Sequence, residues 1–233
     1  MLDYKNKFFS ILGDSLSALE GYSEPPNSAF YEGGTKFLAG VVKPENTWWG
    51  MVINALGAEL LVNNSIAGST VCRHPLCEFP TYACSEERTG ALSKMDINPD
   101  VIMVLLGYND WGCGLKIYND ADKKGNDLTV FSVAYNLMLS NLKRNYPAAE
   151  IWCFTLPVTK CTRIENFKFP YCYAGRHISE YNDYIRIAAK EFGARLIDLN
   201  RACPPCDTVD RFHPTEEGMK IIATATLSEL GVL

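Results

Sequence analysis

The stretch Val101-Ile102-Met103-Val104-Leu105-Leu106 consists entirely of apolar residues. A strand without polar alternation is covered on both faces, which is typical of a parallel sheet packed between helices. Four other short apolar runs are expected to be strands of the same sheet: Phe8–Leu12, Glu59–Val62, Glu150–Phe154 and Arg195–Ile197. Helical patterns lie between or after these runs, at Thr47–Leu56, Ser85–Met95, Leu128–Tyr146, Ile178–Phe192 and Thr215–Leu230. This alternation predicts a three-layer α/β/α fold around a five-stranded parallel sheet.

The length and composition indicate one ordered domain spanning residues 1–233. Hydrophobic residues make up 47% of the chain and charged residues 21%, which suits an ordinary buried core. The formal net charge is −5, and no run of Lys and Arg is long enough to follow a nucleic-acid backbone, so we expect no nucleic-acid partner. The apolar run Phe8–Leu12 is too short for a signal peptide or a membrane span. We therefore expect a cytoplasmic protein that does not span a membrane.

The chain has nine cysteines, an odd number that argues against a disulfide scaffold, so we expect them to be mostly reduced. Two pairs, Cys72 with Cys77 and Cys203 with Cys206, raise the question of a zinc site. The pairs lie far apart in the sequence and lack the compact spacing of a zinc finger. We therefore predict no metal.

Polar motifs follow four of the five predicted strands. Gly13–Ser15 ends the first strand, Asn63–Gly68 follows the second, Gly107–Asp110 follows the third, and Asp210 and His213 follow the fifth. The carboxyl ends of parallel strands meet at one edge of a sheet, where ligands bind. We therefore expect all four motifs to lie close together.

These motifs supply the parts of an activated nucleophile. Ser15, where the first strand is expected to pass into a helix, attacks well only if a base takes its proton, and His213 is the candidate base. Asp210 can hold the imidazole through Nδ1–H. The N–H groups of Ser15 and Gly68 and the side-chain amide of Asn109 can form an oxyanion hole. The set predicts acyl transfer from an ester to water.

The same motifs resemble the sequence blocks of SGNH hydrolases, the GDSL esterase and lipase superfamily. The resemblance covers roughly residues 8 to 230, through Gly13-Asp14-Ser15-Leu16-Ser17, the loop ending in Gly68, Gly107-Tyr108-Asn109-Asp110, and Asp210 with His213. It implies a flavodoxin-like sheet, with no metal or organic cofactor. It also implies that Ser15 is the nucleophile, Gly68 and Asn109 are oxyanion donors, His213 is the base and Asp210 orients it.

Further residues are candidates for supporting roles. Asp14 can cap a helix or tie the serine loop to a neighbour, and Pro214 is expected at the first position of the last helix. The irregular segment 155–176 carries Lys160 and Arg163, which are candidates for substrate binding, as is Arg88. The same segment is rich in aromatic residues, namely Phe167, Phe169, Tyr171 and Tyr173. It can form a cationic, aromatic wall beside the nucleophile, or an exposed basic loop with aromatic residues packed beneath it.

The leading functional hypothesis is a serine esterase that hydrolyses short acyl esters, such as acetyl esters, of carbohydrates or small molecules. A thioesterase, acyltransferase or lysophospholipase can use the same residues. A non-catalytic glycan-binding domain and a redox or zinc-binding role of the cysteines are alternatives from other classes. The sequence leaves the oligomeric state open.

Overall fold

The fold is described by a computed structural model for residues 3–24, 27–73, 82–118 and 126–233. Its centre is a parallel sheet of five strands: β1 (Phe8–Gly13), β2 (Glu59–Ser65), β3 (Val101–Leu105), β4 (Glu150–Phe154) and β8 (Arg195–Ile197). The strand order is β2-β1-β3-β4-β8, with every neighbouring pair parallel. This is the doubly wound order of a flavodoxin-like sheet, which confirms the predicted fold class.

Two strands run further than the apolar pattern predicted. β1 continues to Gly13 and β2 to Ser65, since Leu12 pairs with Asn64 and Gly13 with Ser65. The polar residues Asn63–Ser65 therefore belong to the strand rather than to the loop after it. Ladder pairing with β1, which apolar periodicity does not report, extends β2 into this polar stretch.

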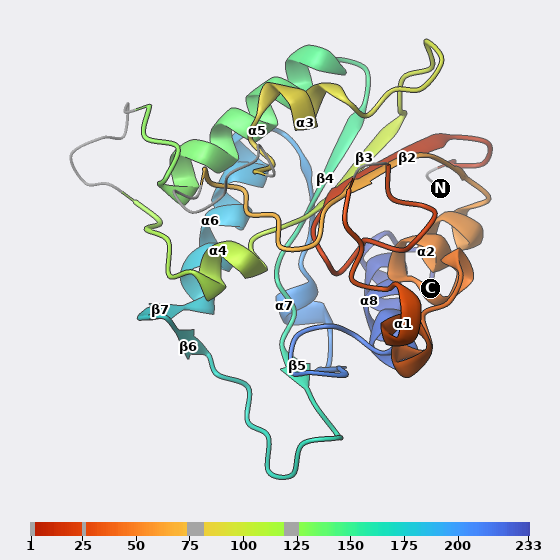
Figure 1. The fold of residues 1–233 in the computed structure, drawn as a ribbon. Coiled ribbons are helices and arrows are strands. Elements are labelled where there is room, and N and C mark those ends of the chain that lie inside the picture. The colour runs from red at the N-terminus through yellow and green to blue at the C-terminus, as the bar shows by residue number, and fades with distance from the viewer. Residues whose placement is uncertain (1–2, 25–26, 74–81, 119–125) are drawn as a thin grey trace.

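Helices cover both faces of the sheet, as Figure 1 shows. On one side α2 (Trp48–Leu56) packs against α8 (Glu216–Glu229). On the other side α5 (Phe131–Asn145) lies between α3 (Glu86–Gly90) and α6 (Ile178–Glu191). The side chain of Thr47 accepts a hydrogen bond from the N–H of Gly50 and caps the start of α2. A single hydrophobic cluster joins the helices to the sheet.

Several short elements escaped the sequence patterns. They are α1 (Gly33–Ala39), the 3₁₀ helix η1 (Pro44–Asn46), α4 (Tyr108–Gly112) and α7 (Leu199–Ala202). The predicted helix at Ser85–Met95 is only the five-residue α3, with Ser85 as its cap. Segments of one or two turns are too short to display a helical period, and therefore periodicity detects only the longer helices.

Residues 155–176, called the arm below, leave the sheet after β4 and form a long excursion from it (Figure 1). The arm contains β5 (Thr159–Lys160) and β6 (Cys172–Tyr173), and its last residue begins β7 (Arg176–His177), which pairs with β6. β5 pairs in parallel with β9 (Cys206–Asp207), the segment that leads to Asp210 and His213. The arm is therefore joined by backbone hydrogen bonds to the loop that carries the predicted base.

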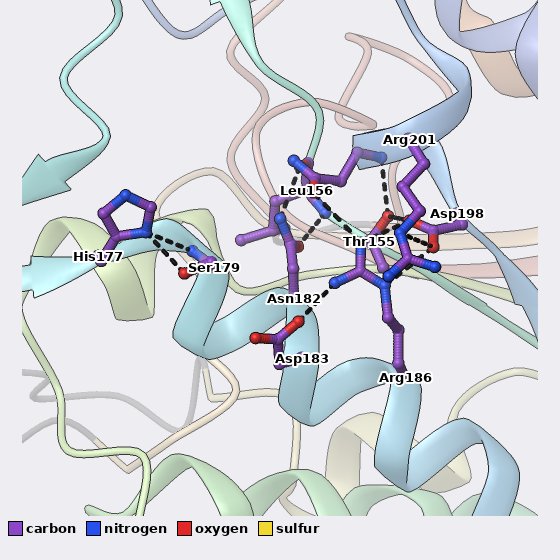
Figure 2. Close-up of polar contacts among 10 residues, drawn as sticks. Thr155, Leu156, His177, Ser179, Asn182, Asp183, Arg186, Asp198 and Arg201 are labelled. Atoms are coloured by element: carbon purple, nitrogen blue, oxygen red, sulfur yellow. Dashed lines mark hydrogen bonds and ion pairs between the residues drawn. The ribbon is translucent and has the colours of Figure 1, made fainter.

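Side chains of α6 and of the segment after β8 fix the start of the arm (Figure 2). Asn182 grips Leu156 on both sides, accepting from its N–H at 2.7 Å and donating to its carbonyl at 3.1 Å. Asp198 accepts hydrogen bonds from the Thr155 hydroxyl and from the guanidinium of Arg186, each at 2.9 Å. A buried amide and a carboxylate with fixed donors hold this backbone in one course.

None of the helices in the described ranges combines the length and the apolar character that crossing a membrane requires.

Candidate active site

Ser15 lies in a tight turn directly after β1. A Cβ at Gly13 would stand 2.6 Å from the Ser65 hydroxyl oxygen on β2, so only glycine fits at the end of this strand. Asp14 shapes the turn, because its carboxylate accepts from the N–H of Leu16 at 2.9 Å and its carbonyl accepts from the N–H of Ser17 at 3.1 Å. The turn does not continue into a helix, so the expectation that Ser15 opens one is wrong.

The structure brings Ser15, His213 and Asp210 into one hydrogen-bonded chain. His213 Nε2 is 2.9 Å from Ser15 Oγ, and His213 Nδ1 is 2.7 Å from Asp210 Oδ2. Burial opposes ionisation of Asp210, but hydrogen bonds from the side chain and N–H of His213 and from the N–H of Phe212 outweigh it and lower its pKa to about 2. Asp210 is therefore a carboxylate at neutral pH, placed to orient the imidazole.

The last helix begins later than predicted. Its cap is Thr215, whose side chain accepts from the N–H of Gly218, and its first residue is Glu216. Pro214 instead forms an isolated antiparallel bridge with Thr208. The bridge keeps Pro214 extended, so His213 stands three residues before the helix rather than at its first turn. Backbone pairing, not the helix terminus, sets the position of His213.

The backbone N–H groups of Ser15 and Gly68 donate to no protein acceptor within the described ranges. Gly68 has φ +79°, a left-handed conformation that favours glycine, and a Cβ there would meet no atom within 4 Å. Its turn is fixed on either side, by Ala67 donating to the carbonyl of Ser28 and Ser69 donating to the carbonyl of Ile66. Two N–H donors of the described residues thus remain available at and beside the turn of Ser15, the candidate nucleophile.

Asn109 and Asp110, on α4, connect this loop to the rest of the site. Asn109 Nδ2 donates to the carbonyl oxygen of Ser69 at 2.8 Å and lies 3.5 Å from Asp14 Oδ2, at the limit of a hydrogen bond. The buried carboxylate of Asp110 accepts from the N–H groups of Val71 and Cys72, at 2.9 and 3.0 Å. Through these hydrogen bonds, Asp110 fixes the segment after Gly68 to α4, the helix that carries Asn109. The sequence pattern did not indicate this role.

Arg88, a candidate for substrate binding, is a buried residue with protein acceptors. It is 3% exposed, and its guanidinium donates to the carbonyls of Gly13 and Asn64, to the Asn64 side chain and to the Ser69 hydroxyl. Burial lowers its pKa to about 10, against the opposing effect of the Asp14 charge. These acceptors hold the guanidinium beneath the loops that carry Ser15 and Gly68, and a part of Arg88 in substrate binding stays a prediction.

Asp14 is buried close to this cation. Burial is the main cause that raises its pKa to about 7, and the charge of Asp110 adds to it, whereas the N–H of Leu16 and the charge of Arg88 oppose it. Its contacts join the serine turn, through the N–H of Leu16, to Asn109 on α4, and its supporting role stays a prediction.

Lys160 and Arg163 lie on the arm, and the structure brings neither into contact with the Ser15 turn. Lys160 is exposed on β5, and its carbonyl accepts from the Thr208 hydroxyl. Arg163 donates to the carbonyl of Leu38 on α1 at 2.8 Å. Their part in substrate binding stays a prediction.

Two of the arm's four aromatic residues, Phe169 and Tyr173, lie near the candidate site. Trp111, two residues after Asn109, has ring-centroid distances of 5.5 Å to Phe169, 5.6 Å to Tyr173 and 6.1 Å to Phe212. Tyr173 and Phe212 are themselves 6.1 Å apart. These four residues are called the aromatic cluster below. Since Phe212 directly precedes His213, the cluster lies against the loop of the candidate base.

Of the two cysteine pairs that raised the question of a zinc site, the structure describes both members of one, Cys203 with Cys206. Cys203 and Cys206 lie together, and a hydrogen bond to Cys203, with burial, raises the pKa of the Cys206 thiol far above its usual value. Cys77, one member of the other pair, lies outside the described residues. Among the residues that the structure does describe, no three His, Cys, Asp or Glu side chains are grouped so that they could hold a metal ion.

One residue at the site was missed altogether. Phe30, in the irregular segment before α1, lies face to face with the imidazole of His213. Two adjacent aromatic residues in a polar loop, Phe30 and Tyr31, were the only signal in the sequence.

Comparisons with known proteins show the family of this chain. The family model described as GDSL-like Lipase/Acylhydrolase matches residues 7–160. A GDSL-like lipase from Bacteroides uniformis ATCC 8492 is 29% identical, with a TM-score of 0.72, over 98% of this chain and 97% of its own. One from Bacteroides ovatus ATCC 8483 is 24% identical, with a TM-score of 0.75, over 98% of this chain and all of its own. None of the curated proteins matches.

A more distant structure shares the fold. A carbohydrate esterase family 2 enzyme with a carbohydrate-binding domain, from Corynascus thermopiles, is 18% identical, with a TM-score of 0.59, over 97% of this chain and 67% of its own. The family match covers well over half of the chain, including the Ser15, Gly68 and Asn109 motifs. The chain therefore belongs to the GDSL-like lipase and acylhydrolase family and is a hydrolase of ester bonds.

Proposed function

We propose that the protein is a serine esterase in which Ser15 is the nucleophile, His213 the general base and Asp210 the residue that orients the base. The observation that carries this proposal is the chain of contacts from Ser15 Oγ to His213 Nε2, at 2.9 Å, and from His213 Nδ1 to Asp210 Oδ2, at 2.7 Å. Both distances are those of hydrogen bonds in a nucleophile–base–orienter arrangement.

In the first half of the reaction, Ser15 Oγ attacks the ester carbonyl carbon while His213 Nε2 takes the hydroxyl proton. The carbonyl oxygen becomes an oxyanion that accepts hydrogen bonds from the N–H of Ser15, the N–H of Gly68 and the amide of Asn109. The ester C–O bond then breaks, and His213 gives its proton to the leaving alcohol. An acyl group remains on Ser15.

In the second half, a water molecule attacks the acyl carbon and His213 takes one of its protons. The second tetrahedral intermediate uses the same oxyanion donors. When it collapses, the carboxylic acid leaves and Ser15 Oγ regains its proton from His213. Asp210 keeps its negative charge throughout and stabilises each imidazolium that forms.

For the substrate, we propose short acyl esters, such as acetyl esters, of carbohydrates or other small molecules with a ring. The support is the aromatic cluster, in which Tyr173 is 45% exposed and Phe212 is half-buried next to His213. Exposed aromatic faces beside a nucleophile offer apolar area to a sugar or aromatic ring, while the ring's polar groups stay in water.

Hydrolysis of p-nitrophenyl acetate tests the nucleophile and the base. Ser15→Ala and His213→Ala should each abolish nearly all activity, whereas Ser228→Ala, at an exposed position on α8, should leave it unchanged. A fluorophosphonate should form one adduct, which peptide mass spectrometry locates on Ser15. Full hydrolysis by Ser15→Ala, or an adduct at another residue, would show that the assignment is wrong.

A substrate panel tests the substrate class and separates it from the alternatives that use the same residues. The panel contains p-nitrophenyl esters of increasing acyl length, acetylated sugars, acyl thioesters and lysophospholipids. The proposal expects the highest kcat/KM for acetyl esters of ring-bearing alcohols. Faster turnover of thioesters or of long-chain lipids would contradict it.

A further inference from the structure

The phenyl ring of Phe30 lies directly on the imidazole of His213. The two ring centroids are 3.5 Å apart and the ring planes differ by 8°. We propose that Phe30 is a positioning residue that holds the His213 imidazole between Ser15 and Asp210 and stabilises its protonated form during turnover. The inference rests on the proposed function, because it assigns to Phe30 a role in the reaction that His213 is proposed to carry out.

The hydrogen bonds of His213 leave one motion of its ring unrestrained. Both bonds, to Ser15 Oγ and to Asp210 Oδ2, are made by ring nitrogens and so direct the ring along the line that joins these partners. The two hydrogen bonds resist a shift of the imidazole along the line between Ser15 and Asp210 much better than a rotation of the ring about that line. A second ring, parallel to the imidazole and in contact with it, blocks rocking toward that side, because van der Waals repulsion rises steeply at shorter distances.

The stacking geometry also suits a ring that becomes positively charged. Two neutral aromatic rings prefer an offset or edge-to-face arrangement, with centroids about 4.5–7 Å apart. Phe30 and His213 are closer and nearly parallel. A cation is attracted to the face of a phenyl ring, and the imidazole becomes a cation each time it takes a proton from Ser15 or from water.

The backbone around Phe30 is anchored firmly enough to hold the ring. The hydroxyl of the neighbouring Tyr31, which is fully buried, donates to the carbonyl of Pro214 at 2.9 Å. The N–H of Tyr31 donates to the carbonyl of Ala18, beyond the serine turn, at 3.3 Å. The carbonyl of Ser28 accepts from the N–H of Ala67, next to Gly68, at 2.9 Å. Residues 28–31 are thus tied to the loops of Ser15, Gly68 and His213.

The test compares Phe30→Leu, which keeps an apolar side chain but removes the ring, with Phe30→Tyr, which keeps the ring. Phe30→Leu should lower kcat for p-nitrophenyl acetate about 3- to 10-fold, the range expected for one aromatic contact, with KM changed less than twofold. The rate of Ser15 labelling by a fluorophosphonate should fall by a similar factor. Phe30→Tyr should stay within about twofold of the wild type. Phe37→Leu, at a 70% exposed position on α1, is the matched control and should change neither rate.

Three outcomes would overturn the inference. The first is an unchanged kcat and labelling rate in Phe30→Leu. The second is a rise in KM alone, which would make Phe30 a substrate contact. The third is equal impairment of Phe30→Leu and Phe30→Tyr, which would mean that the ring is not what matters. Failure of the proposed function is seen separately, as activity that survives Ser15→Ala.

A measurement on the wild-type protein keeps the inference testable if Phe30→Leu does not fold. The chain has only three histidines, so the ring protons of His213 can be assigned by comparison with His213→Gln. A phenyl ring stacked on the imidazole should shift these protons upfield of the values for an unstacked histidine. Resonances at ordinary positions would refute the stack and with it the proposed role.

Discussion

Replacing Asp14 by asparagine should make the protein more stable at alkaline pH than at acidic pH, relative to the wild type. The Asp14 carboxyl is 1% exposed, and burial is the main cause that raises its pKa from 3.8 to about 7. In the unfolded chain the same carboxyl is exposed to water and ionises near its usual pKa. Between these two pKa values the folded state binds a proton that the unfolded state has released, so the stability that Asp14 contributes falls as the pH rises.

The size of the effect follows from the two pKa values. At pH 8 both states are ionised, and a difference of about three pKa units corresponds to a destabilisation of roughly 4 kcal/mol by the Asp14 charge. At pH 5 the folded carboxyl is protonated and only the unfolded one is ionised, so the destabilisation is only about 1–2 kcal/mol. The free energy of unfolding of Asp14→Asn, minus that of the wild type, should therefore grow by roughly 2–3 kcal/mol from pH 5 to pH 8.

Urea unfolding followed by circular dichroism at pH 5, 6, 7 and 8 measures this difference. Taking the variant minus the wild type removes the contribution of every other titrating group that the substitution leaves alone. Asp96→Asn, at an exposed position, serves as the control and should run parallel to the wild type. If the difference for Asp14→Asn is the same at pH 5 and pH 8, burial does not hold the Asp14 proton and the reasoning is refuted.

Two further substitutions test Arg88, which lies beneath the site, and Gly68, a candidate oxyanion donor in it. Arg88→Met removes a buried guanidinium and leaves its acceptors unpaired, so urea unfolding should show a loss of stability of about 3–5 kcal/mol. Arg73→Met, at an exposed position, is the control and should change stability by less than about 0.5 kcal/mol. A loss for Arg88→Met as small as that of the control would show that the hydrogen bonds of Arg88 do not stabilise the fold. Gly68→Ala imposes a side chain on a backbone at φ +79°, so it should lower the free energy of unfolding by roughly 1–2 kcal/mol. It should also lower kcat at least tenfold, because the strained backbone displaces the N–H that is proposed to stabilise the oxyanion. An unchanged kcat would show that this N–H does not bind the oxyanion.

The sequence alone was sufficient to predict the sheet because burial on both faces leaves a direct trace in it. β4 and β8 begin and end where the predicted strands do, and β3 ends one residue before its apolar run. The limits of β1 and β2 could not be read in this way, since Gly13 and Ser65 belong to the sheet through pairing and not through hydrophobicity. The arm was recognised only as a long loop, because its two-residue strands pair with segments far away in the sequence.

The residues of the candidate site also fall into two groups, those that local sequence motifs predict and those that depend on long-range contacts. Ser15, Gly68, Asn109, Asp210 and His213 lie on short motifs at strand ends, so their convergence follows from the direction of the strands. The residues that hold them together act through contacts over long sequence separations. Examples are Arg88 with Gly13 and Asn109 with Ser69. No local pattern distinguishes a buried arginine of this kind from an exposed one. The contact of the Phe30 ring with His213 could not be predicted from the sequence for the same reason.

The buried side chains of Asp14 and Arg88 lower the stability of the fold but hold the loops of the site in place. Burial raises the pKa of Asp14 and lowers that of Arg88, so each charge is harder to maintain there than in water. A purely apolar layer would avoid both penalties, but it could not accept from the N–H of Leu16 or donate to the carbonyl of Gly13. These contacts shape the Ser15 turn, and the hydrogen bond from Arg88 to the Ser69 hydroxyl ties the loop of Gly68 to the same guanidinium. We infer that the fold tolerates the electrostatic cost because Ser15 and Gly68, the proposed nucleophile and a proposed oxyanion donor, sit on separate loops, and directional hydrogen bonds hold these loops at a fixed distance from each other.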